Sequence, residues 1–338
     1  MKEQNDLPII ALSCGDPAGI GPELCIKAAV SEDILSISRP IVYGDSDVLI
    51  LHAESCGLDI QFDVQKAPSK FDWSNSGVKV IELDQFKPKK FEFGQINAAN
   101  GRASFEYGTA AIQAAISGQV AAVVAGPQTQ KSIQLAGIKF DGYPSFVARQ
   151  TGLTSEDCYL MICFDKYRVA HVTLHQSIRQ SLDLITEDRI NHIITVVHET
   201  LIKIGIKQPK ILVSGLNPHA GEQGLFGSEE VQIIRPAILN KRAQGIDVNG
   251  PVAPDLLFNQ KNYDAFIVML HDHGHIPAKL LARHNTIALS IGSPVLFSSV
   301  AHGSAHDIAG KGIAEPSAVV QAVHCLLGIV KTEIKDSE

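Results

Sequence analysis

The sequence lacks the features of a membrane, secreted or nucleic-acid-binding protein. No apolar run is long enough to span a bilayer, and the polar start Met1–Asp6 holds no apolar signal-peptide core. Lys and Arg total 29 against 36 Asp and Glu, for a net charge of −7, and form no basic stripe or tail. We therefore expect a cytoplasmic protein with no nucleic-acid or membrane partner.

Cysteine pairs and the common nucleotide loops are missing as well. None of the six cysteines stands in a CxxC pair, so they predict buried free thiols and exclude a zinc knuckle or a disulfide framework. Neither Walker A nor GxGxxG spacing is present. There is no internal repeat, low-complexity tract or linker. The 338 residues, 45% hydrophobic, therefore predict two lobes that share a sheet.

Apolar, strand-like runs alternate with helix-length segments along the chain. Eight runs predict strands: Pro8–Ser13, Pro40–Tyr43, Val78–Ile81, Val120–Ala125, Tyr167–Ala170, Lys210–Ser214, Ala265–Leu270 and Thr286–Ser290. Helices fit between several of them, for example Gly108–Ile116 and Glu187–Lys203. This alternation predicts an α/β protein with a largely parallel sheet.

The most informative stretch is His271–Lys279, directly after the predicted strand Ala265–Leu270. It holds three histidines, together with Asp272 and Lys279. Imidazole is a good ligand for borderline transition metals, and a nearby carboxylate can orient a ligand or move a proton. Open α/β sheets present their sites at the carboxyl ends of strands. The alternative is a polar loop with solvated histidines.

Two further strands end near a histidine. His219 follows the strand that ends at Ser214, inside Gly215–Glu222, and His175 follows the strand Tyr167–Ala170. Three histidines from three strand ends can converge on one metal ion, although spacing alone does not decide whether they do.

Two glycine-punctuated segments have open interpretations. Ser13–Glu23 follows the first strand and leads into a helix near Pro22, so it is either a structural turn or a ligand loop. In Ala301–Gly312 a short helix would let His302 and His306 share one face and hold a metal. A loop whose small residues approach a dinucleotide fits that composition better, and a plain surface loop is the third option.

Four segments together resemble the 4-hydroxythreonine-4-phosphate dehydrogenase family. They are Gly15–Glu23, Gly215–Glu222, His271–Lys279 and His302–Gly310, which occur in the family's order and span almost the whole chain. The resemblance implies an α/β/α fold similar to isocitrate and isopropylmalate dehydrogenases, with a cleft between two lobes. It further implies a homodimer with a shared active site, a divalent cation (Zn, Mg, Mn or Co), and NAD or NADP. We place the lobes roughly at residues 1–130 plus 290–338, and 131–289.

The resemblance also assigns roles to residues of this chain. The metal ligands fall on His175, His219 and His271, and the catalytic residues on Asp272, Asp255 and Lys279, of which Lys279 also binds substrate. The dinucleotide-binding positions fall on Asn217, Gly221, His302, Gly303, Ser304 and Ala305. In such dimers the second subunit completes the cleft, so one metal ligand can arrive from the partner.

The positions that hold a phosphorylated substrate depart from the family pattern. The usual His-Thr pair is Tyr143-Pro144, a substrate-binding Asn falls on Ala288, and the phosphate-holding Arg falls on Phe297. A lysine falls on Gln130, with Lys131 adjacent, and the Asp before His302 is Ala301. Phe cannot imitate the planar, bidentate grip of Arg, so the phosphate site is expected to be dismantled while the metal and hydride chemistry is retained.

Three hypotheses follow from these residues. The chain is a metal-dependent NAD(P)-linked dehydrogenase of a non-phosphorylated hydroxy acid or diol, with decarboxylation after oxidation where a carboxylate lies β to the new ketone. Alternatively it is a genuine 4-hydroxythreonine-4-phosphate dehydrogenase of vitamin B6 synthesis, with Arg283 or Lys131 taking over the phosphate. The third hypothesis is a ligand-binding homologue without catalysis, against which the retained histidines and aspartates argue.

Overall fold

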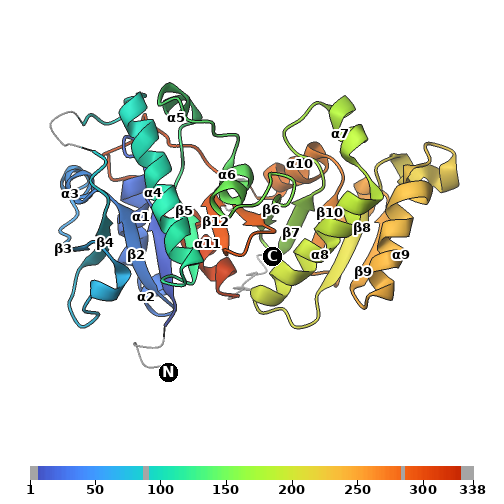
Figure 1. Ribbon diagram of the computed structural model, residues 1–338, viewed down its shortest axis with the longest axis horizontal. Coiled ribbons are helices and arrows are strands. Elements are labelled where there is room, and N and C mark those ends of the chain that lie inside the picture. Colours follow the sequence, from blue (N-terminus) through green and yellow to red (C-terminus); the bar gives the residue numbers. More distant parts are fainter. Residues whose placement is uncertain (1–6, 87–90, 283–285, 329–338) are drawn as a thin grey trace, which may run out of the picture. The chain divides into compact units, whose positions relative to one another are not determined.

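The computed structural model describes residues 7–86, 91–282 and 286–328, which form two compact units (Figure 1). The first unit comprises the chain up to Ser155 together with Ser293–Leu326, and the second comprises Glu156–Gly292. The chain therefore leaves the first unit after Ser155, returns to it at Ser293 and leaves it again after Leu326.

Within its described residues, the first unit holds a sheet of parallel strands. They are β1 (Ile9–Ser13), β2 (Arg39–Gly44), β3 (Phe62–Gln65), β4 (Val78–Glu82), β5 (Ala122–Ala125) and β12 (Phe297–Val300), in the order β3-β4-β2-β1-β5-β12. Ser13 of β1 pairs with Ala125 of β5, which pairs with Ser299 of β12. The loops that follow these three strands consequently leave the sheet at the same edge.

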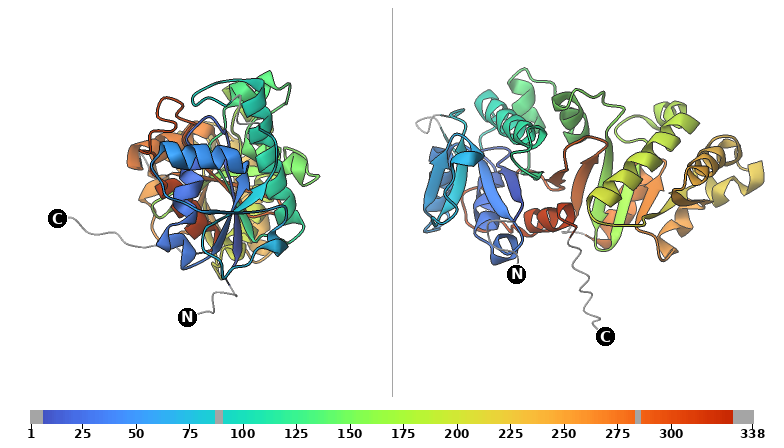
Figure 2. Two further views of the ribbon diagram at one scale, coloured as in Figure 1. Left: turned by 90° about the vertical axis from the view of Figure 1, so that its left-hand side faces the viewer. Right: turned by 60° about the horizontal axis from the view of Figure 1, so that its bottom comes forward.

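Two groups of helices cover this sheet. One group contains α1 (Gly21–Ala29), α2 (Glu32–Leu35), α3 (Ser46–Ser55) and α11 (Ser317–Leu326), and the other contains α4 (Ala98–Ile116), α5 (Gln130–Leu135) and α6 (Tyr143–Gln150). Asn97 caps α4 by accepting a hydrogen bond from the Asn100 backbone N–H at 2.9 Å. Gly101 lets α4 approach α5 closely, because a Cβ there would lie 2.0 Å from the Ser132 carbonyl oxygen. Figure 2 shows α4 from two further sides.

The second unit is a mixed sheet. Its described strands are β6 (Tyr159–Phe164), β7 (Tyr167–His171), β8 (Lys210–Ser214), β9 (Asp247–Val252), β10 (Ala265–Val268) and β11 (Ile287–Ile291), in the order β11-β6-β7-β10-β8-β9. β6 runs antiparallel to both neighbours, whereas β7, β10, β8 and β9 are mutually parallel. The carboxyl ends of β7, β10 and β8 therefore lie side by side.

The helices of the second unit follow from apolar spacing. The 17-residue α8 (Glu187–Lys203) buries Ile190, Ile194, Val197 and Leu201, which recur every three or four residues on one face. It packs against α9 (Arg235–Ala243), while α10 (His271–Leu281) contacts β7 and β10. The remaining helical segments are α7 (Ile178–Leu184) and the short turns η2 (Pro68–Lys70), η4 (Pro218–Gly224), η5 (Glu230–Ile234) and η6 (Pro254–Asn259).

The predicted α/β class is confirmed, and each of the eight predicted runs coincides with a strand whose ends shift by a few residues. Four strands were not predicted, namely β3, β6, β9 and β12. The short helix considered for Ala301–Gly312 is wrong, because that segment consists of turns and irregular backbone. Its glycines and the left-handed backbone of Ala305, with φ of 41°, interrupt helical geometry.

Candidate active site

A cluster of four histidines lies at the carboxyl ends of β7 and β10 in the second unit. His271 is the first residue of α10, and its ring stacks on His275 one turn later, with centroids 3.8 Å apart and an interplanar angle of 7°. The rings of His175 and His271 are 5.7 Å apart, and those of His171 and His275 are 4.7 Å apart. The sequence-predicted ligands His175 and His271 are therefore neighbours.

His171 is the buried member of this cluster. Its side chain is 2% exposed, and its Nδ1 lies 3.3 Å from the Leu160 carbonyl oxygen. Since a carbonyl only accepts, Nδ1 carries the proton and Nε2 holds a lone pair. Within the described part of the chain that Nε2 is buried without a hydrogen-bond partner. Burial, reinforced by His275, lowers the pKa of His171 to about 3, so the ring is neutral.

The neighbouring rings are also held neutral. Burial and the proximity of His271 lower the pKa of His275 to about 4, and the same two causes lower the pKa of His175. Ligation of a metal requires neutral imidazole, so the lowered pKa values leave these rings in the protonation state that ligation requires near neutral pH.

Asp272 makes a direct contact with a predicted metal ligand. The Nδ1–H of His271 donates to Asp272 Oδ1 at 2.7 Å, which leaves His271 Nε2 available for a metal. This hydrogen bond lowers the pKa of the exposed Asp272 carboxyl, so the group stays ionised. Asp272 can therefore orient the His271 ring as well as exchange a proton.

His219 lies in an unusual turn after β8. Five consecutive residues, His219–Gln223, have φ between 42° and 76°, which is left-handed backbone. Because L-residues in this region cost roughly 1 kcal/mol or more each, the turn needs support from its surroundings. Gly221 is required at its centre, since a Cβ there would lie 2.5 Å from Glu230 Oε2.

Glu230 provides that support, and sequence reasoning missed it. Its carboxylate is 1% exposed, and Oε1 accepts hydrogen bonds from the backbone N–H groups of Leu216 and Asn217, both at 2.7 Å. Oε2 accepts from Asn217 Nδ2 at 3.0 Å. Burial alone would raise the pKa of Glu230, but the hydrogen bonds from Asn217 and Leu216 outweigh it and lower that pKa. Asn217, a predicted dinucleotide residue, is thus bound to Glu230.

The other residues predicted to bind the metal or to act in catalysis, His219, Asp255 and Lys279, are exposed. Among the residues that the structure describes, no group of three His, Cys, Asp or Glu side chains lies close enough together to hold a metal ion within one chain. His219 is exposed on η4, Asp255 is exposed on η6, and Lys279 is exposed near the end of α10.

The substrate positions in the first unit form an aromatic cluster. Phe297 on β12 is 1% exposed, and its ring centroid lies 5.1 Å from that of Tyr143 on α6. Tyr143 also contacts Phe140 and Phe146, and its hydroxyl donates to the Gly126 carbonyl oxygen at 2.6 Å. Tyr143 and Phe297, the positions to which the resemblance assigned the family's His and Arg, therefore pack against each other, and the Tyr143 hydroxyl is occupied.

The other departures contribute no positive charge at these positions. Pro144 opens α6, and Ala288 lies in β11 opposite Ile162. Lys131 on α5 is exposed and donates to Gln134 Oε1 at 3.3 Å, so it reaches along its own helix. Arg283, the other candidate for a phosphate contact, lies outside the described residues.

The predicted dinucleotide loop is partly anchored and partly open. His302 and Gly303 are exposed, and a Cβ at Gly303 would meet nothing within 4 Å. Ser304 is 6% exposed, and its hydroxyl accepts a hydrogen bond from Thr129 at 2.9 Å. The open backbone at Gly303 therefore leaves room for a ligand, whereas the Ser304 side chain serves the protein.

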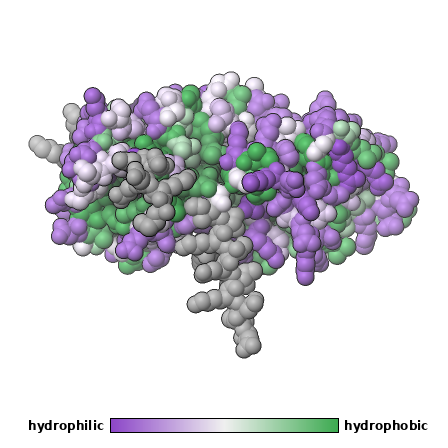
Figure 3. Space-filling model, turned by 90° about the horizontal axis from the view of Figure 1, so that it is seen from below, coloured by the Kyte–Doolittle hydropathy of each residue, from purple (hydrophilic) through white to green (hydrophobic). Residues whose placement is uncertain are grey.

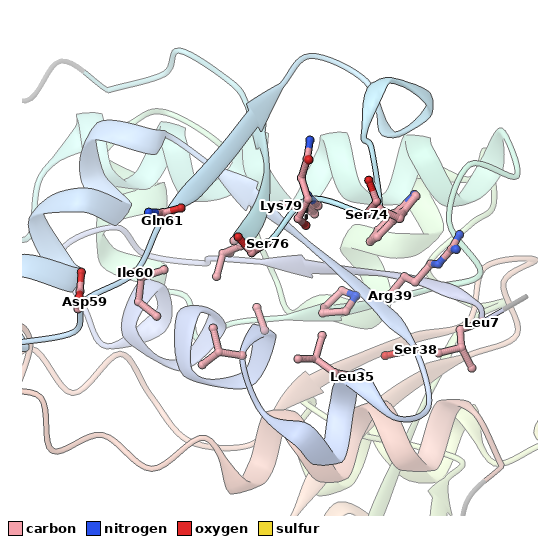
Figure 4. Close-up of a pocket in the computed structure, with 17 residues that line it drawn as sticks. Leu7, Leu35, Ser38, Arg39, Asp59, Ile60, Gln61, Ser74, Ser76 and Lys79 are labelled. Atoms are coloured by element: carbon pink, nitrogen blue, oxygen red, sulfur yellow. Dashed lines mark hydrogen bonds between the residues drawn. The ribbon is translucent and has the colours of Figure 1, made fainter. Parts of the chain in front are cut away.

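A surface cavity of about 790 Å³ lies at the amino ends of strands in the first unit (Figure 4). Leu7, Ser38 and Gly77, which directly precede or flank the starts of β1, β2 and β4, line it. Its two basic residues are engaged: Lys79 Nζ binds Asp63 at 2.7 Å, and the Arg39 guanidinium lies 4.8 Å above the Trp73 ring. None of the sequence-predicted site residues lines this cavity.

Comparison with known sequences and structures establishes the class of protein to which the chain belongs. A protein of Comamonas named 1,2-dihydroxy-3,5-cyclohexadiene-1,4-dicarboxylate dehydrogenase is 37% identical over 94% of this chain and 96% of its own length. One of Oceanobacillus iheyensis, named "Putative D-threonate 4-phosphate dehydrogenase", is 36% identical over 96% and 99%. The crystal structure of 4-hydroxythreonine-4-phosphate dehydrogenase from Klebsiella pneumoniae matches 96% of this chain and 100% of its own, at 34% identity and a TM-score of 0.85. The chain is thus a dehydrogenase, an oxidoreductase that acts on a CH–OH group.

The family follows from a second comparison. The model of the pyridoxal phosphate biosynthetic protein PdxA matches residues 36–326. The chain belongs to the PdxA family, as the four sequence segments indicated. Across the described helices, none is both long and apolar enough to cross a membrane. The face shown in Figure 3 mixes hydrophilic and apolar residues.

Proposed function

We propose that this chain is a metal-dependent, NAD(P)-linked dehydrogenase of a non-phosphorylated hydroxy acid or carboxylated diol. The observation that carries the proposal is the contact between Tyr143 and Phe297. A buried Phe ring against a Tyr whose hydroxyl is bound to backbone presents no donor or charge to a phosphate dianion. Leaving such a dianion unpartnered in a desolvated site costs several kcal/mol.

The second unit supplies the chemistry in this proposal. His175 and His271 hold the divalent cation, with His219 of a second copy as the third ligand, because no third ligand lies close enough among the described residues of one chain. When bound, the cation polarises the alcohol oxygen of the substrate and lowers its pKa. Asp272 keeps His271 oriented through the 2.7 Å hydrogen bond, and Asp272 or Asp255 takes the proton of the alcohol. Lys279 binds a substrate carboxylate.

A homodimer with a shared active site is part of the proposal. α10 exposes Ile276 and Leu280, 54% and 73% accessible, on either side of Lys279. Leu225 and Phe226, which follow the His219 turn, are 72% and 49% exposed. Exposed apolar side chains beside candidate catalytic residues are typical of a surface that another subunit covers.

One relative's name favours the non-phosphorylated class. The Comamonas protein acts, by its name, on a cyclic diol that carries two carboxylates and no phosphate. The competing candidate is a 4-hydroxythreonine-4-phosphate dehydrogenase, favoured by the family model and by the match to the Klebsiella structure.

A substrate screen tests the proposal. The purified protein, loaded with Zn²⁺, Mg²⁺, Mn²⁺ or Co²⁺, is incubated with NAD or NADP and a panel of hydroxy acids and carboxylated diols, with and without a phosphate group, while dinucleotide reduction is followed by absorbance. We expect turnover that depends on metal and disappears with a chelator. Turnover that persists in the metal-free protein contradicts the metal assignment, and reduction only with phosphorylated substrates favours the competing candidate.

A further inference from the structure

Three loops of the first unit meet where β1, β5 and β12 end. Asp16, in the loop after β1, has a fully buried carboxylate. Its Oδ1 accepts a hydrogen bond from the Ala18 backbone N–H at 3.0 Å, and its Oδ2 lies 3.1 Å from His306 Nε2. A buried ionised carboxylate requires such donors, so His306 is the side chain that satisfies the second oxygen of Asp16.

The proton positions follow from the partners. Thr129 Oγ1 donates its proton to Ser304 Oγ at 2.9 Å, so it can only accept from His306 Nε2, 3.3 Å away. Asp16 likewise only accepts. His306 Nε2 therefore carries a proton and points it between a carboxylate and a hydroxyl oxygen. One imidazole connects the loop after β1, the loop after β5 and the loop after β12.

The backbone of the loop after β12 is held on both sides of Ala305, which has a strained conformation. The Ile20 N–H donates to the Ser304 carbonyl oxygen at 2.9 Å, and a Cβ at Gly19 would lie 2.6 Å from that oxygen. Ala305 then adopts φ of 41°, which L-residues rarely do, directly before His306. Such backbone persists only where neighbouring contacts impose it, and here Ser304 and His306 are those contacts.

We propose that His306 is a positioning residue that holds the loop His302–Gly310 in the conformation that receives the dinucleotide. The inference rests on the proposed function, because it takes that loop to be the dinucleotide contact. His306 acts through the loop: its ring anchors to Asp16 and Thr129, while the exposed His302 and Gly303 remain available for the ligand. Removing the anchor lets Ala305 relax and displaces the adjacent backbone.

The anchor has a pH dependence whose sign is fixed by its partners. The hydrogen bond that His306 donates to Asp16, together with the charges of Asp16 and Asp307, raises the pKa of His306, and partial burial opposes it. The facing hydroxyls of Thr129 and Ser304 are neutral at these pH values. The ion pair is therefore complete below the ordinary histidine pKa and weakens as pH rises through the raised value. We therefore expect dinucleotide affinity to fall as pH rises.

The test compares His306→Phe, which removes the donor, with His306→Gln, which keeps an N–H donor but cannot ionise. Dissociation constants for NAD and NADP are measured against pH, with hydrogen exchange of the backbone over 302–310 as a second readout. We expect His306→Phe to weaken binding of the preferred dinucleotide about tenfold and to speed exchange in the loop. His306→Gln restores most of the affinity and abolishes the pH dependence attributed to His306.

The outcomes separate the inference from the proposed function. Wild-type affinity and exchange in a folded His306→Phe protein overturn the inference alone. A wild-type protein that binds neither NAD nor NADP overturns the proposed function and the inference with it. Should His306→Phe fail to fold, Asp16→Asn and His306→Gln decide: an unchanged pH profile in both variants overturns the role of the pair.

Discussion

The proposed substrate positions of the first unit and the histidine cluster of the second unit differ in the kind of side chain they hold. The rings of Tyr143 and Phe297 pack together, carry no charge, and leave no free hydroxyl, because the Tyr143 hydroxyl donates to the Gly126 carbonyl oxygen. Around His271, by contrast, four imidazoles and Asp272 lie together, and the pKa values of His171, His175 and His275 are lowered. The difference teaches where the proposed function can be tested: packed rings occupy the proposed substrate positions, and clustered ionisable groups occupy the proposed catalytic ones.

The largest effect is expected at the metal site. His219→Ala should abolish both metal retention and turnover, because it removes one of three proposed imidazole ligands. Metal content per subunit is measured together with kcat. His192→Gln, an exposed histidine of α8 in the same unit, is the matched control and should leave both values unchanged. Undiminished metal stoichiometry in His219→Ala would show that the assignment is wrong.

A smaller but still severe loss is expected for Asp272→Asn. The amide oxygen can still accept from His271 Nδ1, but the charge and the base are gone. We expect kcat to fall about a hundredfold or more, with dinucleotide affinity unchanged. Near-normal turnover would transfer the proton-transfer role to Asp255 or Lys279.

Glu230→Gln probes the support of the left-handed turn. The amide keeps the size of the side chain but forces an N–H toward the donors of Leu216 or Asn217. We expect metal affinity to drop about tenfold and stability by roughly 2 kcal/mol. Isothermal titration with the metal and denaturant unfolding measure the two effects, and Glu199→Gln, at an exposed position of α8 in the same unit, is the control for stability. Unchanged metal affinity in Glu230→Gln would separate this turn from the metal site.

The smallest effect is expected for Tyr143→Phe. Since the Tyr143 hydroxyl is used by the Gly126 carbonyl oxygen, its removal should cost about 1 kcal/mol of stability and change kcat/KM less than twofold. A tenfold fall in kcat/KM would mean that the hydroxyl meets the substrate, which would weaken the contrast between the two regions.

Local sequence patterns predicted eight of the described strands and part of the histidine cluster, and missed β3, β6, β9 and β12. The central strands are apolar runs, whereas β3 and β9 lie at the ends of their strand orders, and their polar, half-exposed residues leave no such signal. No helix was predicted over His271–Lys279; α10 begins there, and because residues four apart share a helix face it brings His271 and His275 together. Both the predicted segment and its position after a strand were correct.

The rest depends on contacts between residues far apart in the chain. His171 joins the cluster only because β7 lies parallel to β10, with His171 opposite Val268. Glu230 reads as one of several acidic residues until folding buries it beneath the Gly215–Glu222 loop. The substitutions at Tyr143 and Phe297 were predictable one at a time, but their mutual packing requires α6 to lie against β12. Convergence of all three proposed metal ligands remains a prediction.

The central claim is that the phosphate grip has been replaced, and steady-state kinetics test it most directly. The measurement is kcat/KM for 4-phosphohydroxythreonine beside that for the best non-phosphorylated hydroxy acid or carboxylated diol, with the same metal and dinucleotide. The account predicts that the phosphorylated compound is the poorer substrate by about a hundredfold or more. A kcat/KM of roughly 10⁴ M⁻¹s⁻¹ or above for 4-phosphohydroxythreonine, equal to or exceeding the other, would contradict it.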